Sequence, residues 1–161
     1  MNEQIDKTLE FELNDIINNF DESLFTALDK EKIDQLKDDI ISNLPLSNAS
    51  KKEFLQQLKS YKYVDEIDEL KLGCYYRWIN MKSIMDYDTV KITNGGFLYA
   101  YDISADGSDI ILKFHKGNCL KERTRYGKMR FTRIGMKKAL FFQKLTYQEE
   151  IIINILKYLN K

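Results

Sequence analysis

The chain has 161 residues, 43% hydrophobic and 12% aromatic, a composition typical of a folded globular protein and not of a disordered one. No apolar run reaches the roughly 18 residues of a membrane-spanning helix, and the acidic N-terminus does not resemble a secretory signal peptide. The charges cancel overall, but residues 1–70 contain 8 Lys and Arg against 17 Asp and Glu, whereas residues 71–161 contain 17 against 8. We expect an intracellular, cytoplasmic protein with an acidic N-terminal and a basic C-terminal portion.

Residues 1–62 are predicted to form an acidic helical region. Apolar residues recur at three- or four-residue steps from Ile5 to Phe20, which indicates a one-sided helix, and Asp21 is a suitable N-cap for a short second helix. A third helix is expected to end before Pro45, and Ser50–Glu53 has the pattern of a capping box that opens a fourth. The residues expected to face inward in the third and fourth helices are Ile33, Leu36, Ile40, Ile41, Phe54, Leu55, Leu58 and Tyr61.

From residue 63 the pattern changes to that of a basic, β-rich domain. Leu72, Cys74, Tyr76 and Trp78 alternate with other residues at a period of two, which predicts a half-buried strand. Strands are also expected at 89–92, 97–103, 109–115, 123–126, 128–134 and 140–144, with turns that include 93–96, 105–108 and 116–118. Short antiparallel strands joined by tight turns predict a small SH3-like or OB-like β-barrel or curved sheet, with a flat sheet as the alternative.

The chain is expected to close with a helix. Thr146–Glu149 forms a second capping-box pattern, and an inward apolar stripe is expected at Ile151, Ile152, Ile155, Leu156 and Leu159. The predicted fold class is therefore α+β. Its domains are an acidic helical region at 1–62 and a basic β-rich domain with a C-terminal helix at 63–161.

The search for catalytic chemistry gives no candidate. His115 is the only histidine, and the two cysteines, Cys74 and Cys119, are expected to be reduced and structural. The segment 102–107 matches the first half of a calcium-binding loop, but Lys113 stands where such a loop needs a bidentate Glu, so a hairpin turn is the better interpretation. We predict a protein that is not an enzyme, without catalytic residues, metal site or cofactor.

The strongest functional signal is a basic segment, because residues 113–144 contain eleven Lys and Arg and one acid. Such a segment attracts phosphate backbones, and small barrels bind single strands by combining cations with aromatic rings. In the strand 128–134, Met129 and Phe131 are expected to face inward and Lys128 and Arg130 outward. The predicted phosphate contacts are Arg123, Arg125, Lys128, Arg130, Lys137 and Lys138, and Arg77, on the Tyr75 side of its strand, is assigned to the same site. Stacking is expected from Tyr75 or Tyr126, and Tyr99 and Tyr101 are further candidates. The expected function is sequence-nonspecific binding of nucleic acid, DNA or RNA.

Two alternative interpretations of these charges remain open. The cations can dock on the acidic helices of the same chain, or both surfaces can join subunits of an assembly. In either case the partner of the basic face is an acidic protein surface instead of nucleic acid, and no membrane is involved.

Three segments carry a resemblance to a group of viral proteins. LKLGCYYRWI, ITNGGFLYAYDI and FFQKLTYQEEIIINIL follow one another in the chain. Their order is similar to that of small uncharacterised proteins of giant (nucleocytoplasmic large) DNA viruses, with a Gly-aromatic-x-Arg-Trp strand, a Thr-Asn-Gly-Gly hairpin and a Phe-Gln-Lys-Leu strand before a helix. The resemblance covers about residues 65–160. It implies a cytoplasmic or virion-associated protein without a known catalytic motif.

Overall fold

The structure is a computed structural model that describes residues 29–85, 90–116 and 130–159. Over these ranges the chain is α+β, as predicted, with four α-helices and a six-stranded antiparallel sheet. It divides into two compact units, the larger of which is Ile33–Leu145. The two helices predicted before residue 29 lie outside the described residues. No helix within the described ranges is both long and apolar enough to cross a membrane.

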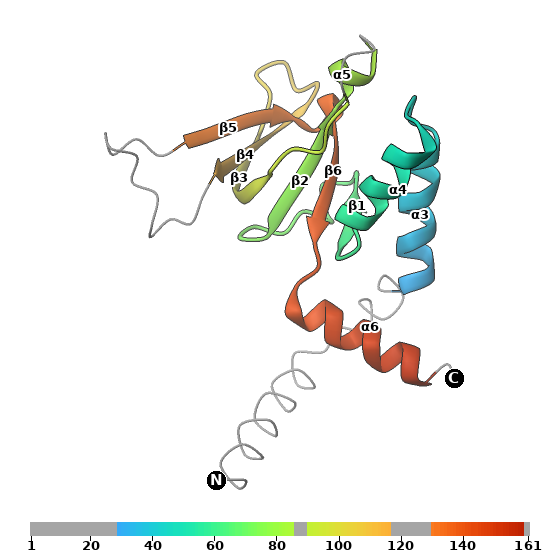
Figure 1. The fold of residues 1–161 in the computed structure, drawn as a ribbon. Coiled ribbons are helices and arrows are strands. Elements are labelled where there is room, and N and C mark those ends of the chain that lie inside the picture. Colours follow the sequence, from blue (N-terminus) through green and yellow to red (C-terminus); the bar gives the residue numbers. More distant parts are fainter. Residues whose placement is uncertain (1–28, 86–89, 117–129, 160–161) are drawn as a thin grey trace, which may run out of the picture. The chain divides into compact units, whose positions relative to one another are not determined.

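The sheet has the strand order β1-β6-β2-β3-β4-β5. Its strands β1 and β5 each have one neighbour, so the sheet is open in the described part of the chain. The one-turn 3-10 helix η1 (Met136–Lys138) connects β5, at the edge, to β6, which pairs with β1 and β2 (Figure 1). The strands are β1 (Tyr61–Val64), β2 (Tyr75–Asn80), β3 (Gly96–Ile103), β4 (Ile110–Lys116), β5 (Arg130–Gly135) and β6 (Ala139–Lys144).

One face of the sheet, called the inner face here, carries the main core. Trp78 of β2 stacks on Phe114 of β4, with ring centroids 4.8 Å apart, and Phe141 of β6 packs against both. Because side chains alternate along a strand, each of these residues fixes which face its neighbours occupy. The buried residues of this core are Val64, Tyr76, Trp78, Leu98, Leu112, Phe114, Ala139 and Phe141.

Two helices cover part of the opposite, outer face. In Figure 1, α3 (Lys30–Ser42) and α4 (Asn48–Gln57) lie beside β1 and β6, while β3, β4 and β5 lie beyond β2. The helices and the strands β2 and β6 contribute to a second core, so the outer face is covered over β1, β6 and β2. Its buried residues are Ile41, Leu44, Phe54, Leu58, Ile79, Val90 and Phe142.

The helix α3 buries a lysine that the apolar pattern does not predict. Leu36, expected to face inward, is 54% exposed, whereas Lys37 is buried. The Lys37 ammonium donates to the carbonyl of Leu58 at 3.1 Å and pairs with Asp34 at 2.9 Å. A lysine can be buried in this way because its aliphatic stem packs as an apolar chain while its charged end is satisfied.

The start of α4 also differs from the prediction. Ser47, and not Ser50, is the N-cap, since its hydroxyl oxygen accepts the backbone N–H of Ser50 at 3.2 Å. At the other end, the helix stops at Gln57, so Tyr61 belongs to β1 instead of a helical face. The expected inward positions Phe54 and Leu58 are buried, as predicted.

The segment before β3 is not the predicted strand. The short helix α5 (Met81–Met85) follows β2 directly, and residues 90–95 have no regular secondary structure. Thr93 nevertheless bonds to β2, since its N–H donates to the Trp78 carbonyl at 3.0 Å and its hydroxyl accepts the Trp78 N–H at 3.1 Å. Gly95 then takes φ +81°, where a side chain would meet the backbone of Tyr76.

The C-terminal helix α6 (Tyr147–Leu159), in the smaller unit, begins with the predicted capping box. The Glu149 N–H donates to the Thr146 hydroxyl at 3.2 Å, and the Thr146 N–H donates to the Glu149 carboxylate at 2.8 Å. The predicted apolar stripe is only partly right. Ile152 is buried, but Ile153 is buried where Ile155, 43% exposed, was expected.

The capping of α4 gives a direct stability test. Replacing Ser47 with Ala removes the oxygen that caps the helix, so S47A should lower the free energy of unfolding by about 1 kcal/mol. The matched variant S50A keeps the cap and should change it by less than about 0.5 kcal/mol. Urea unfolding followed by circular dichroism measures both. A larger loss for S50A than for S47A would place the cap at Ser50 after all.

Candidate nucleic-acid interface

The structure describes only part of the predicted site. Arg123, Arg125, Tyr126 and Lys128 lie outside the described residues. Arg130 is the first residue of β5 and pairs in register with Lys116, but its side chain is outside the description. The side chains that can be placed are those of Tyr75, Arg77, Lys137 and Lys138.

Arg77 is engaged within the molecule and does not present a free guanidinium. Its Nε donates to the Thr93 carbonyl at 2.8 Å, and its Nη2 donates to the Gln57 side chain at 3.1 Å. These bonds join β2, the segment before β3 and α4. Arg77, which the sequence assigned to the nucleic-acid site, therefore holds three segments of the protein together through its side-chain hydrogen bonds.

The two predicted lysines lie in the η1 turn and are exposed. Lys137 is anchored, because its N–H donates to the Asp109 carboxylate at 3.2 Å and its ammonium donates to the Ser108 carbonyl at 2.6 Å. Lys138 forms no ion pair with another described residue. The turn thus holds one fixed cation and one available cation next to each other.

The predicted orientation of β5 is wrong. Phe131, expected to face inward, is 54% exposed, whereas Ile134 packs against the inner core. The register with β4 explains this, since Thr132 lies opposite Phe114 and Ile134 opposite Leu112, both of them inner-face residues. Phe131, one residue along from Thr132, must then lie on the outer face.

Aromatic rings run across the outer face of four strands. The edge of the Tyr75 ring meets Phe97 with centroids 4.9 Å apart, and Phe97 stacks on His115 at 5.3 Å with an interplanar angle of 20°. Tyr99 lies 6.3 Å from His115 and 5.4 Å from Phe131. We call these five residues, Tyr75, Phe97, Tyr99, His115 and Phe131, the aromatic row.

A β-bulge explains why Tyr99 joins the aromatic row and Tyr101 does not. Leu98 pairs with Phe114 and Ala100 with Lys113, so Tyr99 is an extra residue in β3. The bulge reverses the alternation, and Tyr101 therefore pairs with the inner-face residue Leu112. Of the tyrosines considered as stacking platforms, Tyr75 and Tyr99 lie in the row.

The aromatic row is accessible at its far end. Tyr99 is 41% and Phe131 54% exposed, while Tyr75, Phe97 and His115 are half-buried. The row lies on β2 to β5, and all but Tyr75 belong to the strands beyond those that α3 and α4 cover. Two large, exposed rings held against half-buried ones form a surface on which planar groups can stack.

Charged residues lie beside the aromatic row on the same face. Lys113 of β4 is paired with Asp102 of β3, and Arg133 of β5 lies directly opposite Lys113. Arg133 is exposed and has no ion-pair partner among the described residues. Two cations opposite each other repel, and Asp102 offsets only one of them, so a net positive charge remains next to the rings.

Three cations of the β-rich portion, Arg133, Lys137 and Lys138, have no ion pair with the described helices α3 and α4. The ion pairs of the helical segment are local, Lys32 with Asp29 and Lys37 with Asp34. Within the described residues, no ion pair links Arg133, Lys137 or Lys138 to a carboxylate of residues 33–57. Self-docking of the two charged portions is thus not seen at these three positions.

The motif that resembles half a calcium loop is a hairpin turn, as predicted. The Asp106 carboxylate accepts the Ser104 hydroxyl at 2.6 Å and the Ser108 hydroxyl at 2.8 Å, and Gly107 takes φ +70°. These hydrogen bonds hold the pKa of Asp106 well below its usual value. In the described residues, no three His, Cys, Asp or Glu side chains are grouped as metal ligands.

Comparisons with known proteins add no family to this geometry. The sequence matches no protein-family model, no curated protein and no solved structure. The residues of the site are therefore interpreted from their chemistry and geometry alone.

The orientation of β5 can be tested by truncating aromatic side chains. Because Phe131 is half-exposed, F131A should lower the free energy of unfolding by at most about 1 kcal/mol. The control F114A removes a fully buried ring and should cost about 3–5 kcal/mol. Chemical denaturation of both variants measures the difference. Equal losses would mean that Phe131 faces the core.

Proposed function

We propose that this protein is a non-enzymatic binding module that binds single-stranded nucleic acid without sequence preference. The exposed aromatic row on the outer face is the observation that supports this most directly. A single strand leaves its bases unpaired, so they are free to stack on protein rings, and every base offers a π-face to such a ring. Stacking of this kind gives affinity without base-specific hydrogen bonds.

The cations supply the second part of the proposed interface. Arg133 and Phe131 are two residues apart on the same face of β5, so their side chains leave the strand about 7 Å apart. A stacked base on Phe131 would then place its phosphate within reach of Arg133. In this proposal Arg123, Arg125, Lys128, Arg130, Lys137 and Lys138 extend the phosphate contacts, Tyr126 adds a ring, and Arg77 instead supports the segment next to Tyr75.

The strand order supports the proposal that the sheet has an SH3-like arrangement. Sequential antiparallel pairing of β2, β3, β4 and β5, followed by a one-turn 3-10 helix and a return of β6 to β2, is the connectivity of SH3-like barrels. Small barrels commonly bind their ligands on an exposed surface of the sheet. A cytoplasmic or virion-associated setting, as the viral resemblance implies, is compatible with such a module.

A protein partner is the second candidate, and the same surface supports it. Tyr99 and Phe131 are large exposed apolar rings that touch, with a charged row of Asp102, Lys113 and Arg133 beside them. An exposed apolar patch with charges around it is also typical of protein interfaces. An acidic protein surface or a further copy of the chain would then replace the nucleic acid in an assembly.

The proposal predicts how binding depends on rings and on salt. Titrating the full chain into a fluorescein-labelled oligothymidine of about 16 nucleotides should raise its anisotropy, and affinity should fall as salt increases. Y99A and F131A should each weaken binding about five- to a hundredfold without changing the salt dependence, because stacking is not ionic. R133A should instead reduce the slope of log K against log salt by about 0.7.

The control variant is Y147A, since Tyr147 of α6 is an exposed tyrosine outside the aromatic row. Y147A should bind the oligothymidine with the affinity of the unaltered protein. The unaltered protein should bind oligonucleotides of other base composition with a similar affinity. No binding at low salt, or an equal loss for Y147A and F131A, would rule out the proposed interface. If the protein does not bind the oligonucleotide but binds an acidic protein or a further copy of itself, the result would favour the protein-interaction function.

A further inference from the structure

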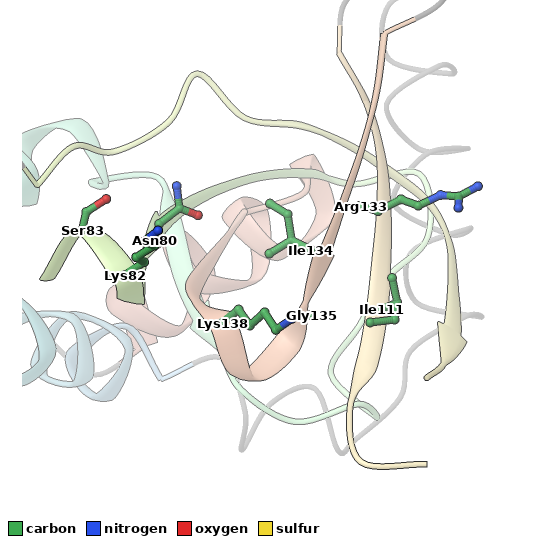
Figure 2. A pocket seen from close by; sticks show the side chains of 8 residues that line it. All are labelled: Asn80, Lys82, Ser83, Ile111, Arg133, Ile134, Gly135 and Lys138. Atoms are coloured by element: carbon green, nitrogen blue, oxygen red, sulfur yellow. The ribbon is translucent and has the colours of Figure 1, made fainter. Parts of the chain in front are cut away.

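A separate pocket, lined by both charged and apolar side chains, lies where β5 runs into η1. It has a volume of about 630 Å³, within the usual range for small-molecule sites. Figure 2 shows its walls: Asn80, Lys82 and Ser83, from the end of β2 and from α5, form one side, and residues of β5 and η1 form the other. The aromatic row does not line it.

The charged side chains that line this pocket are all positive, and one carboxylate, that of Asp109, lies behind the lining residue Gly135. Lys82, Arg133 and Lys138 line it, and none of its described lining residues carries a carboxylate. No ion pair within the described residues neutralises these three side chains. Asn80 and Ser83 add an amide and a hydroxyl, which can donate hydrogen bonds to an anion. Three cations against one nearby carboxylate, together with neutral donors, favour an anionic ligand.

The remaining lining residues are apolar or small, so the pocket suits more than a bare ion. Ile111 and Ile134 contribute apolar surface, and in Figure 2 Ile134 lies between Asn80 and Arg133 while Ile111 lies beside Arg133. Gly135 makes room for the Asp109 carboxylate behind this wall, since a Cβ there would collide with it. A ligand with one charged group and one apolar or planar part would use both kinds of surface.

We propose that this pocket binds the phosphate group of a nucleotide, with Lys82 and Lys138 holding the phosphate from opposite walls and the isoleucines contacting the sugar or base. The nucleotide is either free or the phosphorylated end of a strand, and both present a phosphate monoester. As a statement about strand binding the inference rests on the proposed function, but the pocket itself can be tested without a strand.

Arg133 connects the pocket to the aromatic row. It lines the pocket and also lies on the face of β5 that carries Phe131. In Figure 2 its guanidinium extends away from Asn80, Lys82 and Ser83. It is therefore placed to contact the next phosphate of a strand whose end occupies the pocket. This arrangement gives a bound strand a fixed end and a direction along the sheet.

The experiment compares ligands that differ only by phosphate. We expect adenosine monophosphate to bind the full chain at least about tenfold more tightly than adenosine by calorimetry or NMR titration, since hydrogen bonds to a charged group are stronger than those between neutral groups. K82A and K138A should remove this difference, whereas K52A, an exposed lysine of α4 outside the pocket, should preserve it. A 5′-phosphorylated strand should likewise bind more tightly than the same strand with hydroxyl ends, and a 3′-phosphorylated strand identifies which end is held.

The outcomes separate this inference from the proposed function. Equal affinity for adenosine monophosphate and adenosine, or an unchanged difference in K82A and K138A, would overturn the phosphate site even if strands bind through the aromatic row. Phosphate-dependent nucleotide binding that is lost in K138A would support the site even if strands fail to bind. A preference for the monophosphate without any preference among strand ends would restrict the ligand to a free nucleotide.

Discussion

The surface chemistry of this protein depends on the register of β3, β4 and β5, which the inner core fixes. Leu98, Leu112 and Phe114 are fully buried on one face, and they pair across the strands so that the intervening residues must lie on the other face. A slip of one residue would exchange the two faces and bury charged groups in the core. The cost of that exchange keeps Phe131 and its neighbours in solvent, although exposing a phenylalanine is itself unfavourable.

The bulge at Tyr99 adds to this constraint at a single position. A regular strand that places Phe97 outward would place Tyr99 and Tyr101 outward as well. The extra residue keeps Tyr99 between His115 and Phe131 but returns Tyr101 to the side of Leu112. Bulges commonly re-aim side chains in this way near functional surfaces, and here the effect is to concentrate the rings on the central and edge strands.

The sequence predicted the elements better than it predicted their faces. The alternation of Tyr76 and Trp78 and the capping box at Thr146 are local signals, and the structure confirms them. The side of the sheet to which Phe131 belongs depends on pairing with β4, a contact between distant residues that no local period contains. Lys37 was missed because burying an ammonium requires the carbonyl of Leu58, the residue that follows the end of α4. Phe97 and His115 were missed as a stacked pair for the same reason, although the Phe97-x-Tyr99 spacing offered a partial signal.

The edge strand β5 carries both candidate sites, so its attachment matters to each. It has one strand neighbour, and its end is held by the Asp109 carboxylate, which accepts the N–H of Ile110 at 2.8 Å and that of Lys137 at 3.2 Å. The same carboxylate leaves no room for a side chain at Gly135. A single acid thus ties β4 to η1, fills the space beside Gly135 and fixes the backbone on which Lys138 is placed. Phe131 and Arg133 both belong to β5, so this strand positions the ring of one site and a cation of the other. A ligand that shifts β5 at one site would therefore also change the geometry of the other site.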